Sequence, residues 1–192
     1  MPAASSSRSS AKRRSCGNGA RIIPTLKGDR FVLRAFREDD VPALTAMHGD
    51  PEVMRYLRSN GEVEPRPRQA WDYIALQMGH WLLKGYGKWA LADAANDELI
   101  GRVGYFDPPY EWPGLELGWT LSRRVWGKGY ATEAARLALD WGFEALAGDQ
   151  IISAINPANA ASIRVAERLG MRHVRDDLLH GTPCRIYAKA RA

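Results

Sequence analysis

Short stretches in which apolar and polar residues alternate recur along the chain, and such alternation is typical of β-strands with one buried face. Two of them, 88–93 and 99–106, flank the turn-forming pair Asn96-Asp97 and predict a β-hairpin. A turn near Gly181 joins the last two predicted strands. The other strands that the pattern predicts cover 30–36, 115–121, 151–155, 174–175 and 185–190.

Helical periodicity fills the intervals between these strands. Apolar residues spaced three and four apart predict helices over 68–83 and 132–147, and Gly85 and Gly87 end the first of them. The shorter predicted helices are one that Asp39 or Asp40 caps and that runs through Leu44 and Met47, one over 51–57, and one that Asn159 caps and that ends at Leu169 before Gly170. Strands interspersed with helices predict an α/β fold of the α+β type with a mixed sheet.

Charge is distributed unevenly and bears on the domain organisation. The chain has 192 residues, a length that favours one domain with a sizeable core. Its net charge of +5 resides in residues 1–21, which hold five basic and no acidic residues, whereas 22–192 hold 22 of each. We therefore expect a flexible basic leader over 1–24, a single domain over 25–192, and no nucleic-acid partner for the folded domain.

Composition also restricts the cellular compartment and the metal cofactors that we expect for this protein. No run of 18 apolar residues and no signal-peptide core is present, so we expect no membrane partner. Cys16 and Cys184 form no disulfide framework, which fits a reducing, cytoplasmic location. The four histidines lack metal-ligand spacing, and no metal is expected.

The clearest chemical signal is a glycine-bearing turn between the strand that ends at Leu121 and the helix predicted from residue 132. Residues 124–131 read Arg-Val-Trp-Gly-Lys-Gly-Tyr-Ala. A turn at a helix N-terminus directs backbone N–H groups and the positive end of the helix dipole toward one point. Gly127 and Gly129 let a bulky anion approach the backbone. The segment therefore predicts a site for a phosphate or pyrophosphate.

Spacing separates three kinds of phosphate loop. The pattern G-x-x-x-x-G-K-[ST] fails because Gly129 follows Lys128. The dinucleotide pattern would place Thr132 in its third small position, late in the chain rather than after a first strand. The pattern R/Q-x-x-G-x-G/A is met by Arg124, Gly127 and Gly129. It resembles the acetyl-coenzyme A loop of the GCN5-related N-acetyltransferase (GNAT) superfamily.

Two further segments resemble the same superfamily, in particular its branch that acetylates ribosomal proteins, the RimJ/RimL type. Residues 156–171 resemble the N-x-x-N-x-x-S…L-G-[FM] segment of that branch, and 29–40 with 50–54 resemble its first strand and helices. The resemblance covers about residues 25–192 in matching order. It implies a GNAT-like fold, in which a mostly antiparallel twisted sheet has splayed central strands and flanking helices.

The resemblance also implies where acetyl-coenzyme A binds. The pantetheine arm would pair with the splayed strands as an added strand does, a backbone N–H near Thr120 or Leu121 would face the thioester oxygen, and the loop would hold the pyrophosphate. Two alternatives stay open for Lys128, which is either a phosphate contact or a solvated side chain. Trp126 likewise either covers the cofactor or packs against the protein. The implied cofactor-binding residues are Thr120, Leu121, Arg124, Val125, Trp126, Gly127, Lys128, Gly129, Tyr130, Ala131, Asn156, Asn159 and Ser162.

Two residues are candidates for proton transfer. Glu116 points to the opposite face from Leu115 and Leu117 and is either a general base or a solvent-facing glutamate. Ser162 is either a donor to the departing sulfur or a first-turn packing residue. Many superfamily members carry a tyrosine acid where this chain has Ala166.

The leading hypothesis is an acetyl-coenzyme A-dependent N-acetyltransferase, monomeric or homodimeric, whose acceptor is a primary amine on a protein N-terminus or a small molecule. Ala166 keeps open an alternative, a catalytically weak acyl-coenzyme A-binding module. A third reading, RNA association through the leader, predicts salt-sensitive binding. The aromatic residues Trp71, Tyr73 and Trp81 are expected to pack in the core, whereas an acceptor wall is predicted from Tyr105, Phe106, Tyr110 and Trp112.

Overall fold

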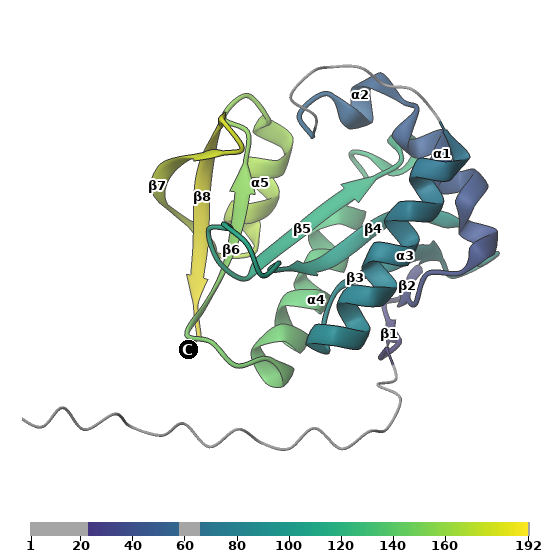
Figure 1. Ribbon diagram of the computed structural model, residues 1–192, viewed down its shortest axis with the longest axis horizontal. Coiled ribbons are helices and arrows are strands. Elements are labelled where there is room, and N and C mark those ends of the chain that lie inside the picture. Colours follow the sequence, from purple (N-terminus) through teal and green to yellow (C-terminus); the bar gives the residue numbers. More distant parts are fainter. Residues whose placement is uncertain (1–22, 58–65, 192) are drawn as a thin grey trace, which may run out of the picture.

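Eight strands form one mixed sheet in the computed structural model, which describes residues 23–57 and 66–191 (Figure 1). They lie in the order β1-β2-β3-β4-β5-β6-β8-β7, and every neighbouring pair is antiparallel except β5 and β6. The strands are β1 (Leu26–Lys27), β2 (Phe31–Arg34), β3 (Lys88–Asp93), β4 (Leu99–Phe106), β5 (Glu116–Leu121), β6 (Gln150–Ile155), β7 (Arg172–Leu179) and β8 (Thr182–Ala190).

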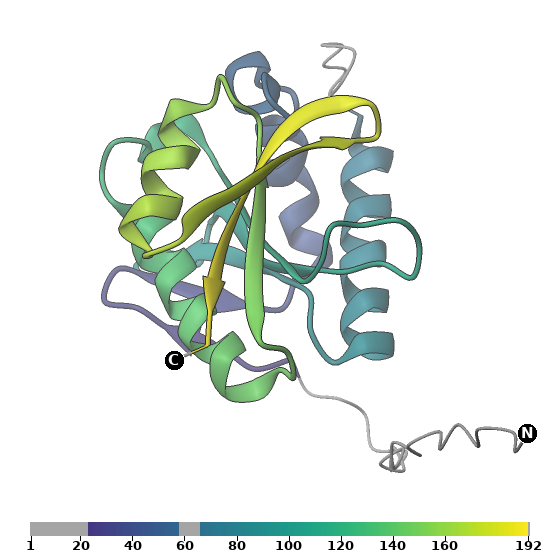
Figure 2. The same ribbon diagram turned by 90° about the vertical axis from the view of Figure 1, so that its left-hand side faces the viewer.

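Helices cover both faces of the sheet (Figure 2). One core cluster joins Ala90 and Leu99 of the sheet to apolar side chains of the first three helices, and a larger one joins the other sheet face to the last two. The helices are α1 (Val41–His48), α2 (Pro51–Met54), α3 (Pro67–Lys84), α4 (Tyr130–Ala145) and α5 (Ala160–Arg168), with 3-10 turns η1 (Glu38–Asp40) and η2 (Arg123–Val125). None of the described helices is long and apolar enough to cross a membrane.

The parallel strands β5 and β6 pair only where they begin. Glu116 lies opposite Ile152, whose N–H donates to the carbonyl of Leu115 at 3.0 Å. Beyond this pair the hydroxyl of Ser153 donates to the carbonyl of Leu117 at 2.6 Å, and the strands then diverge toward their carboxyl ends (Figure 1). The splayed central strands expected for a GNAT-like fold are confirmed, and they leave a wedge-shaped opening in the middle of the sheet.

Most predicted elements are present, with shifted ends. The hairpin strands β3 and β4 coincide with the prediction, and Asp97 adopts the left-handed conformation of its turn with φ 58°. The helix predicted over 132–147 begins two residues earlier, because the turn closes at Gly129. Strand β7 is much longer than the predicted 174–175, since as an exposed edge strand it carries no apolar alternation.

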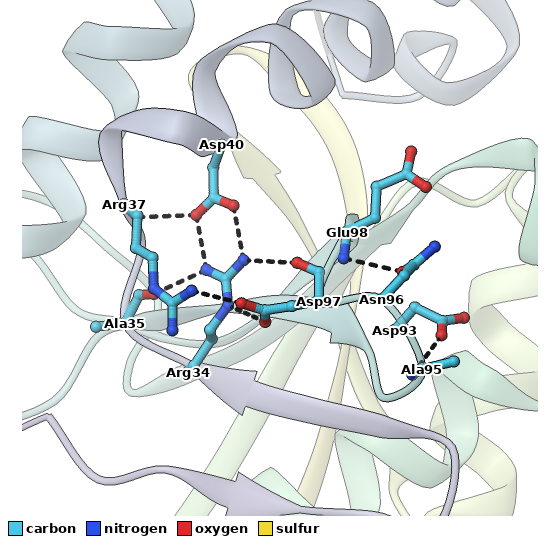
Figure 3. A network of polar contacts seen from close by, with 9 residues as sticks. All are labelled: Arg34, Ala35, Arg37, Asp40, Asp93, Ala95, Asn96, Asp97 and Glu98. Atoms are coloured by element: carbon cyan, nitrogen blue, oxygen red, sulfur yellow. Dashed lines mark hydrogen bonds and ion pairs between the residues drawn. The ribbon is translucent and has the colours of Figure 1, made fainter.

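Three expectations need correction. Asp40 does not cap α1 with its side chain, because the carboxylate accepts hydrogen bonds from the Arg34 guanidinium and the Arg37 N–H (Figure 3). Trp71 does not pack in the core, since 53% of it is exposed, although Trp81 does. The predicted first strand, 30–36, is shorter in the structure, where β2 covers only Phe31–Arg34. Most of the predicted leader lies outside the described residues.

Candidate active site

The wedge between β5 and β6 continues into a cleft of about 100 Å³. Its walls come from elements far apart in the sequence: the end of α2, the middle strands of the sheet and the first turn of α5. The lining residues are Tyr56, Leu57, Lys88, Arg102, Glu116, Leu117, Gly118, Trp119, Thr120, Ser153, Ala154, Ile155, Asn156, Asn159 and Ser162. Five sequence-predicted site residues therefore meet in one cleft: Glu116, Thr120, Asn156, Asn159 and Ser162.

Glu116 stands at the narrow end of the wedge, where β5 and β6 still pair. The indole Nε1–H of Trp112 donates to its carboxylate at 3.1 Å. Burial raises the pKa of Glu116, against the lowering influence of Lys88, the Trp112 hydrogen bond, a backbone hydrogen bond from Ala154, and Arg102. The carboxylate is thus held in the cleft rather than in solvent, which favours the base reading over the solvent-facing one.

The register of β4 and β5 decides which backbone groups face the wedge. Ser122 N–H donates to the Ile100 carbonyl, and Arg102 lies opposite Thr120. Because antiparallel strands direct alternate N–H groups to the same neighbour, the Thr120 N–H faces β4 whereas those of Trp119 and Leu121 face the wedge. Of the two residues expected to supply an N–H to the thioester oxygen, Leu121 has this orientation, and Thr120 contributes its side chain to the cleft.

The opposite wall is built by the segment from Asn156 to Ser162. Asn159 caps α5 as predicted, its side-chain oxygen accepting from the Ser162 N–H at 3.0 Å. Asn156 Oδ1 accepts from the Ala158 N–H, which fixes the preceding turn. Both asparagine amide groups therefore keep their N–H₂ donors available at the cleft. Ala166 has 0% exposure, so its position faces the core rather than the cleft.

The glycine loop lies directly beyond the carboxyl end of β5, at the wide end of the wedge, and does not line the cleft itself. Gly127 and Gly129 have φ of +71° and +85°, a left-handed conformation that L side chains rarely adopt. The N–H groups of Tyr130, Ala131 and Thr132 begin α4, where no intrahelical acceptor exists and Gly129 supplies no capping side chain. These donors fit a phosphate group.

Side chains of the loop are mostly engaged with the protein. Arg124 pairs with Glu98 at 2.8 Å and donates to the Leu99 carbonyl, so it anchors the loop to the β3–β4 hairpin. Trp126 packs back through a hydrogen bond from its Nε1–H to the Leu121 carbonyl at 2.8 Å. Val125 belongs to the core. The loop's contribution to an anion site is therefore mainly its backbone.

A basic residue outside the motif holds this loop in place. Arg30 donates to the carbonyl of Lys128 at 2.5 Å and pairs with Glu133 in the first turn of α4 at 2.6 Å. Its guanidinium also lies 4.2 Å from the centre of the Tyr130 ring. Arg30 lies far from the loop in sequence, so the motif carries no signal for it.

The structure corrects one residue of the predicted aromatic acceptor wall. Tyr105 is fully buried, with its hydroxyl donating to the Ala138 carbonyl at 2.8 Å, and is therefore a core residue. Trp112 contacts both Glu116 and Phe106, and it borders a second cavity of about 360 Å³ that reaches the β7–β8 turn. Sequence reasoning missed Lys88, Arg102 and Ser153, which are placed at the cleft by strand register alone.

Comparisons with known proteins agree with this geometry. A family model described as an acetyltransferase (GNAT) domain matches residues 30–172. The protein YkkB of Bacillus subtilis is 33% identical over 165 residues, or 84% of this chain and 92% of YkkB. The protein named uncharacterized N-acetyltransferase p20 of Bacillus licheniformis is 30% identical over 78% of this chain and 83% of its own length. The acetyltransferase structure from Agrobacterium tumefaciens shares 29% identity and a TM-score of 0.73, covering 93% of this chain and 99% of that one.

Proposed function

Because the chain belongs to the acetyltransferase (GNAT) domain family, we propose that it transfers the acetyl group of acetyl-coenzyme A directly to a primary amine. Family membership makes the protein an acetyltransferase. The proposal adds acetyl-coenzyme A as the donor, direct attack on its thioester, and a primary amine as the acceptor. The acceptor is a protein N-terminus or a small molecule, and the 156–171 segment relates the chain to the ribosomal-protein branch.

One observation carries this proposal: a half-buried carboxylate and a set of outward-facing backbone N–H groups lie along the β5 side of one wedge. Glu116 occupies the narrow end, and the N–H groups of Trp119 and Leu121 face the opening. Asn159 and Ser162 supply the other wall. An extended pantetheine arm has the shape and the polar groups to pair with such strand edges.

Each residue of the cleft has a role that follows from its chemistry. Acetyl-coenzyme A, when bound, supplies an acetyl thioester that an uncharged amine can attack. Glu116 accepts the proton of the amine, directly or through a water, and its raised pKa brings it nearer the pH at which bases work best. The N–H groups of Trp119 and Leu121 are the donors that face the wedge and are available to the acetyl oxygen, and Trp119 is the nearer to Glu116. Ser162 is the hydroxyl donor on the α5 wall, since Ala166 is buried.

The phosphate-bearing end of the cofactor is assigned to the loop and to the first turn of α4. The N–H groups of residues 127–131 and the positive helix end supply donors and potential for two phosphates. The side chain of Lys128 adds a cation at this end. Arg30 positions the loop from outside by holding the Lys128 carbonyl.

Thiol release from acetyl-coenzyme A tests the function. The panel contains peptides with different N-termini, polyamines, aminoglycosides and amino acids, and we expect amine-dependent release. Glu116→Gln should lower kcat by about 10²- to 10⁴-fold, the usual contribution of a general base, with coenzyme A affinity retained. Glu144→Gln, an exposed glutamate on α4, is the matched control. Tight coenzyme A binding without release for any amine would instead establish the acyl-coenzyme A-binding module.

A further inference from the structure

Two cations, Lys88 and Arg102, line the cleft beside Glu116 on neighbouring strands. Lys88 of β3 lies opposite Gly104 of β4, which in turn lies opposite Gly118 of β5. Arg102 lies opposite Thr120 in the same way. Cross-strand partners share a face of a sheet, so both cations are on the face that carries Glu116 and that α1 and α3 cover.

The missing side chain of Gly118 lets Lys88 reach β5. A Cβ at Gly118 would lie 3.1 Å from Lys88 Nζ and 3.7 Å from Glu116 Oε1. The ammonium group therefore lies over the backbone of β5, close to the carboxylate, in space that any other residue at 118 would fill. It forms no ion pair with Glu116 or with another described carboxylate.

Arg102 is held from behind by α3. Its Nη1 donates to the Tyr73 hydroxyl at 2.6 Å, and its guanidinium carbon lies 4.5 Å from the centre of the Tyr73 ring. Its Nε is buried and has no hydrogen-bond partner among the described residues. Like Lys88, it forms no ion pair with a carboxylate in the part of the chain that the structure describes. A guanidinium has five N–H donors, so donors beyond the one that reaches Tyr73 remain for a ligand.

The charge of the lining is therefore unbalanced. Among the described lining residues, two are cationic and Glu116 is the single carboxylate. Both cations are half-buried, and no lining carboxylate besides Glu116 offsets their positive charge, so the cleft favours binding of an anion. The two cations also lower the pKa of Glu116, so a role confined to tuning Glu116 is the competing explanation.

We propose that Lys88 and Arg102 bind an anionic group of the acceptor, so that the substrate is a primary amine that carries a carboxylate or phosphate close to its amino group. This inference rests on the proposed function, because it names the class of amine that the cleft acetylates. The anion lies above Gly118 between the two cations, and the amine faces Glu116. A free amino acid and a peptide N-terminus with an acidic side chain both offer this chemistry.

The same two charges select the reactive form of the amine. Positive potential beside an ammonium group favours loss of its proton, and attack on a thioester requires the uncharged amine. Acceptors with additional positive charges, such as polyamines, are repelled by Lys88 and Arg102. The cleft therefore discriminates for negative charge on the acceptor and against a second positive charge.

The test compares matched acceptors with and without the anion, and each rate is referred to the uncharged fraction of its amine, because amidation also lowers the pKa of the amino group. Amino acids are paired with their carboxamides, and acidic peptides with the corresponding amide-bearing peptides, in the thiol-release assay. The wild type should prefer the anionic member of a pair. Lys88→Met and Arg102→Met should each reduce that preference by about 10- to 100-fold, as expected for a charged hydrogen bond. Lys27→Met, an exposed lysine on β1, should leave it unchanged.

The ratio of rates between paired acceptors separates anion binding from tuning of Glu116. A shifted pKa of Glu116 would change the rates of both members of a pair equally. Equal losses for charged and amide acceptors in Lys88→Met and Arg102→Met, or a wild-type preference for the amide member of every pair, would overturn the inference and leave the acetyltransferase proposal standing. Calorimetric titration of the paired N-acetylated products with the coenzyme A-bound protein gives the same comparison without turnover. Equal product affinities there would also overturn it.

Discussion

The sequence around Glu116 does not distinguish it from a solvent-facing glutamate, but its surroundings in the fold do. A position that alternates with Leu115 and Leu117 can face solvent on any half-buried sheet. Here that face is covered, and the wedge leaves the side chain between Trp112 and the Ala154 backbone. Its chemistry is therefore decided by what stands around it: burial favours its protonated form, and neighbouring cations and donors oppose that preference.

In the proposed mechanism Trp112 positions the base Glu116, and Trp112→Phe tests this role. The hydrogen bond from Trp112 lowers the pKa of Glu116, so its loss raises that pKa further. A base acts only when ionised, so activity falls as pH drops through this pKa. We expect the acid limb of the kcat/KM profile to move to higher pH in Trp112→Phe. The exposed tryptophan in Trp71→Phe is the control. An acid limb at the same pH in Trp112→Phe would show that Trp112 does not influence the pKa of Glu116.

At the level of elements, the wedge lies between two strands that each pair fully with their outer neighbour. All six residues of β6, Gln150 to Ile155, have partners on β8, whereas β5 keeps a full ladder with β4 and meets β6 at one pair. Ser153 closes the narrow end by bonding the Leu117 carbonyl. Beyond that pair no ladder joins β5 to β6, and the unpaired backbone groups between them become available to a ligand.

The loop after β5 depends on backbone conformation at Gly127. A Cβ there would meet nothing within 4 Å, so Gly127→Ala creates no clash, and its effect comes from the left-handed φ of +71°. We expect a stability loss of about 1–2 kcal/mol and at least about tenfold weaker coenzyme A binding as the N–H groups turn away. Gly181→Ala, at φ +78° with equally open space, should cost similar stability and leave coenzyme A affinity intact. Urea unfolding and calorimetric titration measure the two quantities. Unchanged affinity in Gly127→Ala would remove the loop from the cofactor site.

On the scale of the whole molecule, a buried ion-pair network joins the edge of the sheet to the first helices (Figure 3). Arg34 of β2 makes a two-bond contact with Asp40 at 2.8 Å for each bond and pairs with Asp97 at 2.7 Å. Arg34 and Asp40 are 6% and 4% exposed. Asp40 also accepts from the Arg37 N–H and so links β2 to η1, and Arg34 joins both to the hairpin turn through Asp97.

This network predicts a graded loss of stability. Asp40→Asn leaves the Arg34 charge buried with a neutral partner and should cost about 3–5 kcal/mol in urea unfolding. Asp97→Asn removes a half-exposed partner and should cost under about 1 kcal/mol. Arg34 lowers the pKa of Asp97, so the stabilisation from Asp97 is present near neutral pH and is lost as pH falls through that lowered pKa. Equal losses in the two variants would contradict the difference in burial.

Local pattern in the sequence determined most helices and strands of this protein and the glycine turn that is proposed to bind the cofactor. The β3–β4 hairpin, the cap of α5 at Asn159 and the glycine turn before α4 follow from residues close together in sequence, because turn and cap chemistry acts over a few residues. The family resemblance of the loop and of residues 156–171 supplied the splayed sheet, which the strand pairing confirms.

The tertiary structure alone decided what surrounds Glu116. Lys88, Arg102 and Ser153 reach the cleft through the pairing of strands that are distant in sequence, and no local pattern records which residues will lie opposite one another. The same reason explains Asp40, whose carboxylate bonds Arg34 instead of capping its helix. Burial then raises the pKa of Glu116, because desolvation depends on every packed neighbour and not on residue type alone.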